Sequence, residues 1–326
     1  MKPYLLSLIL LLPALAAGAA DPGRLQQEFI TEMATRYGFD AQALGRLLEQ
    51  AEVRQSILEA IARPAEKRLD WGKYRKIFLT RERIRGGLRY WRDNAEVLAR
   101  AEQQYGVPPE IIVAIIGVET RYGRHAGRYR VLDALTTLGF HYPPRAAFFR
   151  GELREFLLLA REEDADPTAL LGSYAGAMGK PQFIPSSFRA YAVDFDGDGR
   201  RDIWENDADV IGSVANYFAR HGWQRGQPVT RRIQGVDTSL QAVIDRGYKP
   251  HTTVGRLRGA GVRLARSLPD DLPAALLALH DGERTEHWLV LNNFHVITRY
   301  NHSPLYAMAV FQLADALRRL HDRKMP

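Results

Sequence analysis

The stretch VPPEIIVAIIGVE, residues 107–119, predicts the start and body of one helix. Proline is tolerated in the first turn of a helix, and an acid such as Glu110 is favoured near the positive end of the helix dipole. The residues from 111 to 118 are apolar nearly all round the predicted helix. A helix without a polar face is expected to be buried, so this segment predicts the centre of a helical core.

Glu119 is the acid that ends this apolar run. It follows Ile115 and Ile116 by four and three residues, so it shares their face of the predicted helix. Apolar surroundings and the negative end of the helix dipole both disfavour a carboxylate, and we expect them to raise the pKa of Glu119. A raised pKa suits a general acid near neutral pH. The alternative is a buried structural glutamate paired with Arg121 or Arg145.

The segments before and after this helix are also largely helical. Apolar residues recur at helical spacing over 21–100, which predicts an N-terminal helical domain. The next segment, 101–223, is mostly helical with glycine-rich turns. The last segment, 298–326, contains a strong helical pattern at 306–320 and is expected to return to the core.

Residues 224–297 differ in character, because short apolar runs are separated by Gly, Pro and Asp. The runs 274–279 and 287–291, on either side of a turn at 281–283, predict two short strands. The expected fold class is therefore mainly α, with a small β-rich insertion.

The composition limits the chemistry that the chain can perform. It has 326 residues, of which 46% are hydrophobic and 25% charged, so it is expected to be globular. There is no cysteine, which excludes disulfides, thiolate catalysis and a lipidated N-terminal cysteine. The formal charge is +7, but Lys and Arg are dispersed among acids and apolar residues, so we expect no nucleic-acid partner. Carboxylates, histidines, hydroxyls, amides or a hard metal ion remain, and we expect no organic cofactor.

Residues 1–20 have the pattern of a secretory signal peptide: Lys2, then an apolar run, then small residues. We expect cleavage near Ala19 or Ala20, which lowers the formal charge to +6 by removing Lys2. The apolar run is too short to cross a bilayer, so no membrane anchor is expected. The alternative is a retained anchor. The predicted product is a soluble exported protein.

The acidic segment 194–205 matches the calcium loop of an EF-hand position by position. Glycine stands at position 6, and the pattern places oxygen ligands at positions 1, 3, 5, 7 and 12. The alternative is a solvated acidic turn. The predicted calcium ligands are Asp194, Asp196, Asp198, Arg200 through its backbone carbonyl, and Glu205.

Three motifs in this sequence resemble those of the lytic murein transglycosylase B family. They are GVETRYG at 117–123, GSYAGAMG at 172–179 followed by QFIPSS at 182–187, and RYN at 299–301. The resemblance implies a lysozyme-like helical core flanked by a helical domain and a small β domain. It also implies cleavage between N-acetylmuramic acid and N-acetylglucosamine of peptidoglycan, with a 1,6-anhydromuramyl product and Glu119 as the catalytic acid. Some members are lipoproteins, whereas this chain resembles a soluble periplasmic form.

The same resemblance implies the remaining site residues. Asn301 could hold Glu119 by a hydrogen bond, and Asp209 takes the closing position of a longer calcium loop, 194–209. The alternatives are a turn cap for Ser173, a surface amide for Gln182, and plain core for Tyr74 and Met178. The implied substrate-binding residues are Tyr74, Arg145, Ser173, Met178, Gln182, Tyr217, Tyr300, Asn301 and Tyr306.

The residue inventory also indicates the product. Most glycoside hydrolases use two carboxylates, and none of the three motifs offers a second one for that role. A single carboxyl can act as acid and then as base if the muramyl C6 hydroxyl replaces water. The alternatives are a hydrolytic muramidase and a non-catalytic peptidoglycan-binding protein. The expected partners are glycan strands, with other cell-wall enzymes as candidate further partners, and the expected state is a monomer.

Overall fold

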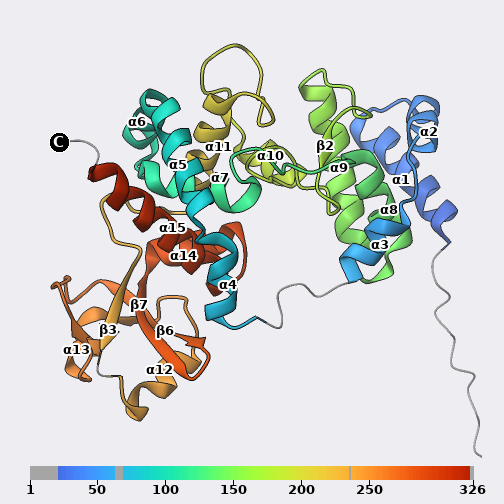
Figure 1. Cartoon of the computed structure of the whole chain (residues 1–326). Helices are drawn as coiled ribbons and strands as arrows, with labels where there is room; N and C mark the ends of the chain where they lie inside the picture. Colours follow the sequence, from blue (N-terminus) through green and yellow to red (C-terminus); the bar gives the residue numbers. More distant parts are fainter. Residues whose placement is uncertain (1–20, 63–68, 235, 324–326) are drawn as a thin grey trace, which may run out of the picture.

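The computed structural model describes residues 21–62, 69–234 and 236–323, and it is mainly helical (Figure 1). The helices are α1 (Pro22–Tyr37), α2 (Ala41–Glu49), α3 (Gln55–Ala62), α4 (Trp71–Phe78), α5 (Arg81–Asp93), α6 (Ala95–Tyr105), α7 (Pro109–Thr120), α8 (Val131–His141), η1 (Pro143–Arg145), α9 (Ala146–Glu162), α10 (Pro185–Tyr191), α11 (Asp207–Arg220), η2 (Thr238–Leu240), α12 (Gln241–Asp245), α13 (Val254–Gly259), α14 (Asn292–Tyr300) and α15 (Pro304–Asp322). The strands are β1 (Tyr129–Arg130), β2 (Leu171–Gly172), β3 (Thr230–Gln234), β4 (Thr252–Thr253), β5 (Arg263–Leu264), β6 (Pro273–Asp281) and β7 (Arg284–Leu291).

Helix α7 is the buried helix that the sequence predicts. Pro109 occupies its first turn, and every residue from Ile111 to Val118 is buried. It packs against α15, α5, α11 and α6. Each fully buried Ile or Val of this helix contributes about 1.5 to 3 kcal/mol relative to an exposed one. The apolar sequence of α7 therefore requires a surrounding layer of other helices.

The predicted N-terminal helical domain of 21–100 is divided between two groups of helices. Helices α1 and α3 pack against α8, at one end of the molecule, whereas α4 and α5 pack against α15 (Figure 1). Asp133 of α8, which is 1% exposed, joins the first group to the core by accepting hydrogen bonds from Glu52 N at 3.0 Å and Arg54 Nε at 3.3 Å. Local periodicity predicts these helices, but their partners lie some 80 residues later in the chain.

The small β unit is an antiparallel sheet with strand order β4-β6-β7-β3-β5. Strands β6 and β7 form the predicted hairpin, which is paired from Ala274 with Leu291 to Asp281 with Arg284. Alternate residues of a strand point to opposite faces. Accordingly Ala275 and Leu277 join the main core, whereas Ala274 and Leu276 join the separate core of the β unit. The sheet ends at Leu291, so α14 occupies the last part of the predicted segment 224–297.

The β hairpin also holds helix α4. Arg75 of α4 donates to Asp281 at 2.8 Å and to Glu286 at 3.3 Å. The Asp281 side chain lies against the backbone of α4 at Gly72, where an added Cβ would lie 1.8 Å from Asp281 Oδ1. Helix α4 contacts both β6 and α15, so it connects the β unit to α15.

Within the three described ranges, no helix combines the length and the hydropathy needed to cross a membrane. The predicted signal peptide, residues 1–20 with its cleavage site near Ala19 or Ala20, lies outside the described residues.

The close approach at Gly72 generates a stability prediction. We expect Gly72→Ala to lower the free energy of unfolding by about 1 to 3 kcal/mol, because the new methyl group displaces Asp281. In an Asp281→Ala background the same change should be neutral or stabilising, since Ala favours a helix over Gly by about 1 kcal/mol. Chemical denaturation of the four proteins gives the coupling.

Gly45→Ala on α2 is the matched control, since nothing lies within 4 Å of a Cβ there. If Gly72→Ala had the same effect in both backgrounds, Asp281 would not be the obstacle.

Candidate active site

Glu119 lies at the end of α7, where the helix stops because the next residues turn the chain. Arg121 and Tyr122 adopt left-handed backbone angles, with φ of 51° and 63°. The Tyr122 side chain folds back over Gly117, where an added Cβ would lie 2.5 Å from the tyrosine hydroxyl. Glu119 itself is half-buried, although eight successive residues before it are buried. Its carboxylate therefore sits where the buried helix reaches the surface of the core.

Tyr306 holds this carboxylate. Its hydroxyl donates a hydrogen bond to Glu119 Oε1 at 2.5 Å. The position of Tyr306 is set by Ser303, whose hydroxyl accepts from Tyr306 N at 3.3 Å and caps α15. Burial, and then the negative charge of Glu119, raise the pKa of Tyr306 well above its usual value. Tyr306 therefore keeps its proton and remains a donor to Glu119.

A second tyrosine, Tyr300, lies beside the same carboxylate. Burial and the charge of Glu119 also raise the pKa of Tyr300 well above its usual value. The Tyr300 hydroxyl donates to Pro181 O at 2.6 Å, and its ring centroid lies 4.7 Å from that of Tyr217. Tyr217 in turn donates to Arg299 O at 2.6 Å. The segment after the β unit thus returns to Glu119 and is fixed there by tyrosine hydroxyls.

In the second motif, the side chains of Ser173 and Gln182 hold the turn in place. Ser173 Oγ accepts from the backbone N–H groups of Ala175 and Ala177, at 3.2 and 3.0 Å. Gln182 has a φ of 54°, and its Nε2 donates to Ala126 O at 3.0 Å and to Gly179 O at 2.9 Å. Ser173 thus makes the hydrogen bonds of a turn cap. Contact of Ser173 or Gln182 with a substrate stays a prediction.

Met178 and Tyr74 are both buried, at 0% and 2% exposed. Met178 pairs by backbone with Gly172 and Phe183. Tyr74 packs its ring 5.2 Å from that of Phe78, and its charge contributes to the raised pKa of Tyr306, which places it near that side chain. Both side chains are therefore packed in the interior, and contact of either one with a substrate stays a prediction.

Arg145 and Asn301 are the remaining residues of the predicted site. Arg145 is exposed, and its guanidinium lies 4.3 Å from the ring centroid of Phe148. Asn301 ends α14, and its carbonyl accepts from Ser303 N at 2.7 Å. The hydrogen bond from Asn301 to Glu119 and the contact of Arg145 with a substrate stay predictions. The sequence analysis did not assign the hydrogen bond that Tyr306 donates to Glu119.

Thr120 and Lys180 are structural parts of the site that the sequence analysis did not assign. Thr120 Oγ1 donates to Lys180 O at 2.9 Å, which joins the end of α7 to the second motif. Lys180 Nζ then donates to Asp207 at 2.8 Å and to Glu205 O at 3.1 Å. Thr120 directly follows Glu119 inside the first motif, and this position could have indicated its structural role.

The acidic loop brings Asp194, Asp196 and Asp209 together, with one carboxylate oxygen of each within 4.8 Å of the others. Asp209 is fully buried and accepts from Phe195 N and Asp202 N, each at 2.7 Å. Burial raises the pKa of Asp209, and the charges of Asp196 and Asp194 add to this effect. Three acids that repel one another at one point form a possible site for a hard cation.

The other predicted metal ligands have different contacts. Asp198 Oδ1 accepts from Arg200 N at 2.9 Å, which shapes the loop. Glu205 N donates to Asp202, and Glu205 O accepts from Lys180. Of the two candidates for the closing ligand, Asp209 rather than Glu205 is grouped with Asp194 and Asp196.

Comparison with known proteins identifies the family. The family described as transglycosylase SLT domain matches residues 23–315. Membrane-bound lytic murein transglycosylase B of Escherichia coli (strain K12) is 46% identical over 300 residues, covering 89% of this chain and 82% of that protein. The chain belongs to the transglycosylase SLT domain family. It is therefore an enzyme, a lytic transglycosylase.

Solved structures agree with this assignment. Soluble lytic transglycosylase SltB1 from Pseudomonas aeruginosa has a TM-score of 0.87 and 54% identity, covering 92% of this chain and 99% of that one. Slt35 of Escherichia coli in complex with calcium has a TM-score of 0.83 and 45% identity, covering 91% of this chain and 93% of that one. SltB3 from Pseudomonas aeruginosa in complex with NAG-anhNAM-pentapeptide has a TM-score of 0.82 and 33% identity, covering 92% of this chain and 80% of that one. The predicted lysozyme-like, mainly α fold is confirmed.

The Tyr306 hydrogen bond generates a prediction on turnover. We expect Tyr306→Phe to lower kcat about 10- to 100-fold, the equivalent of one hydrogen bond to a charged group. The fold should persist, since only the hydroxyl is removed.

Tyr90→Phe is the matched control, because Tyr90 donates to another carboxylate, Asp207, at 2.9 Å. If both variants lost activity equally, the effect would come from stability and not from Glu119. Turnover and melting temperature are measured on the same preparations.

Proposed function

We propose that the chain cleaves the β-1,4 bond between N-acetylmuramic acid and N-acetylglucosamine of peptidoglycan, without water, and that Glu119 is its single acid and base. The observation that carries the proposal is Glu119 at the end of the buried helix, held by Tyr306. The names of its relatives support the substrate: one is a murein transglycosylase, and another binds NAG-anhNAM-pentapeptide.

The reaction needs two proton transfers, and one carboxyl can perform both. Protonated Glu119 gives its proton to the glycosidic oxygen as the bond from that oxygen to C1 breaks. The N-acetyl group of the substrate shares the positive charge that develops at C1. The carboxylate of Glu119 then removes the proton of the muramyl C6 hydroxyl, whose oxygen attacks C1 and closes the 1,6-anhydro ring. Glu119 ends protonated, as it began.

Tyr306 serves the second of these transfers. A hydroxyl that donates to a carboxylate stabilises its charged form and fixes its orientation. Because Tyr306 keeps its own proton, it supports Glu119 without competing for the proton in transit. The case for a single acid rests on the three motifs, which contain no carboxylate besides Glu119.

The substrate-binding residues belong to the same proposal. They come from α4, η1, the second motif, α11 and the segment that follows the β unit. Those proposed to line the cleft are Tyr74, Arg145, Ser173, Met178, Gln182, Tyr217, Tyr300 and Asn301.

We also propose that the loop 194–209 binds calcium as a structural ion. Its support is the grouping of Asp194, Asp196 and Asp209, together with the calcium complex of Slt35. Oxygen ligands suit calcium rather than a softer metal. Asp209 belongs to α11, so the ion would fasten the loop to that helix. The loop takes no part in the proton transfers.

The place of action is proposed from the sequence. The pattern of residues 1–20 favours export and work in the periplasm after cleavage near Ala19 or Ala20. Glycan strands are the proposed partner. A monomeric state and contacts with other cell-wall enzymes stay predictions.

Product analysis tests the catalytic proposal. We expect purified peptidoglycan to yield 1,6-anhydromuramyl ends by mass spectrometry, and Glu119→Gln to abolish them, because an amide can neither donate nor accept the proton. Glu110→Gln, at the other end of α7, is the control and should keep activity. Reducing ends heavier by one water would identify a hydrolytic muramidase. Unchanged cleavage by Glu119→Gln would refute its role.

Metal removal tests the calcium proposal. Chelation should lower the melting temperature, and added calcium should restore it. At one hundred times its Kd, calcium should raise the free energy of unfolding by about 2.7 kcal/mol. Asp209→Asn should remove this response, whereas Glu205→Gln should retain most of it. A melting temperature that ignores both chelator and calcium would contradict the proposal.

A further inference from the structure

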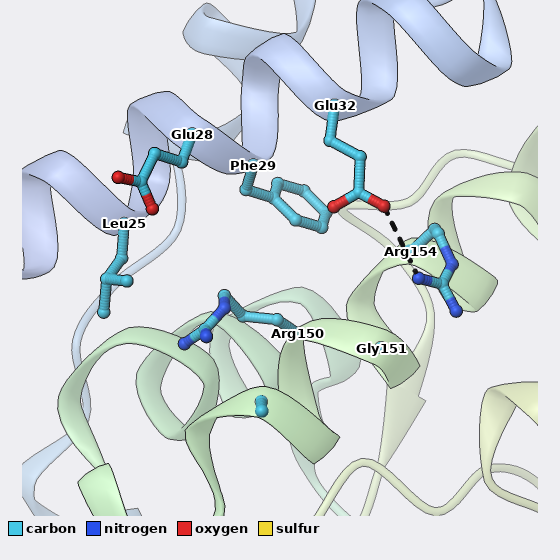
Figure 2. Close-up of a pocket in the computed structure, with 8 residues that line it drawn as sticks. Leu25, Glu28, Phe29, Glu32, Arg150, Gly151 and Arg154 are labelled. Carbon is cyan, nitrogen blue, oxygen red and sulfur yellow. Dashed lines mark ion pairs between the residues drawn. The ribbon is translucent and has the colours of Figure 1, made fainter.

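A cavity of about 290 Å³ lies between α1 and α9, in the helical group that does not contain Glu119 (Figure 2). Figure 2 shows side chains of α1 on one wall and those of α9 on the other. The lining residues are Leu25, Glu28, Phe29, Glu32, Ala147, Arg150, Gly151 and Arg154.

The two walls of this cavity carry opposite charges. Glu28 and Glu32 come from α1, whereas Arg150 and Arg154 come from α9 (Figure 2). At one end Arg154 reaches Glu32 at 3.8 Å, so the walls meet there in a loose ion pair. Along the rest of the cavity the acidic and basic walls face each other across open space.

Arg150 lines the cavity without an acid beside it. Among the described residues, no carboxylate lies within 4.0 Å of its guanidinium, whose Nη1 donates to Gly139 O at 2.9 Å. Glu28 pairs at 2.8 Å with Arg24, which is 77% exposed and therefore holds it weakly. Both Arg150 and Glu28 can thus take a ligand group at little cost.

The base of the cavity is apolar and has room. Phe29 is 4% exposed and comes from α1, between Glu28 and Glu32 of the acidic wall (Figure 2). At Gly151 an added Cβ would meet nothing within 4 Å, so this glycine leaves space that a side chain would fill. A short aliphatic chain fits along Phe29 and Gly151.

We propose that this cavity binds the free end of the diamino acid in a peptidoglycan stem peptide, that is, an ammonium and a carboxylate together on an aliphatic chain. The carboxylate would meet Arg150, the ammonium would meet Glu28 and Glu32, and the methylene groups would lie on Phe29. A simple anion is repelled by the two glutamates, and a simple cation leaves Arg150 unpaired. A purely apolar ligand would remove water from charged groups without replacing it.

This inference rests on the proposed function, because it assigns a second contact with the same wall polymer. The site belongs to the group of α1, α8 and α9, whereas Glu119 and Tyr306 belong to α7 and α15. It therefore holds a peptide-bearing strand at a point apart from the reacting bond.

Binding of a stem tripeptide without glycan tests the site directly. The probe is L-Ala-D-Glu-meso-diaminopimelate, and the comparison peptide carries Lys in place of the diamino acid, so that it lacks only the side-chain carboxylate. We expect saturable binding of the probe by calorimetry and about tenfold weaker binding of the Lys peptide, the loss of one charge-assisted contact. Equal binding of the two peptides would overturn the proposal.

Gly151→Leu is the blocking variant, since its side chain enters the cavity from a helix that tolerates leucine. It should weaken the probe at least tenfold, and Glu28→Gln should weaken it by a smaller factor. Gly45→Leu on α2, where a Cβ also meets nothing within 4 Å, is the control and should bind like the unmodified protein. Equal binding by Gly151→Leu and Gly45→Leu would show that the cavity is not the site.

Activity separates this proposal from the catalytic one. Gly151→Leu should cleave peptide-free glycan at the normal rate and slow only on peptide-bearing peptidoglycan, with KM raised and kcat kept. If the chain makes no anhydro products at all, the catalytic proposal fails. The cavity proposal is then still decided by the calorimetric binding of the tripeptide. No saturable binding of the tripeptide would overturn the cavity proposal and leave catalysis untouched.

Discussion

Burial of α7 is the constraint on which the rest of the structure depends. A helix that is apolar all round needs neighbours on every side, and α5, α6, α11 and α15 supply them. In the last turn of α7, Glu119 alone is half-buried, whereas Val118 and Thr120 on either side of it are buried. The same packing that stabilises the core therefore places one carboxylate at its edge, within reach of a tyrosine 187 residues later.

The β unit contributes to this arrangement from outside the core. Its hairpin sends alternate residues into two apolar clusters, so it is fastened to the helices by its own side-chain period. Arg75, held by Asp281 and Glu286, then fixes α4 against α15. The sheet is thus connected through α4 to the helix that carries Tyr306.

The sequence predicts the local parts of this structure well. The apolar run before Glu119 is α7, the hairpin lies where the two apolar runs and the turn between them indicated, and the final helix extends two residues beyond 306–320 at each end. These features depend on spacing within one segment. The family motifs also indicated Glu119 and Tyr300, and the calcium-loop pattern indicated Asp194, before their surroundings were known.

The long-range parts could not be predicted in the same way. No local pattern states that Tyr306 donates to Glu119, because that contact depends on how α15 packs. The loop pattern alone favours Glu205 as the closing acid, and only the position of α11 brings Asp209 there. The division of 21–100 depends likewise on the buried Asp133, which binds a segment about 80 residues earlier.

That last contact bears on how the chain reaches its native state. Helices α1 to α3 emerge first during synthesis, yet Glu52 and Arg54 find Asp133 only after α4 to α7 have been made. Contacts between distant parts of a chain form slowly, because the intervening loop must close first. Helices α1 to α3 therefore lack their contacts with Asp133 until α8 has been synthesised, and the order of synthesis makes this end of the core one of late completion.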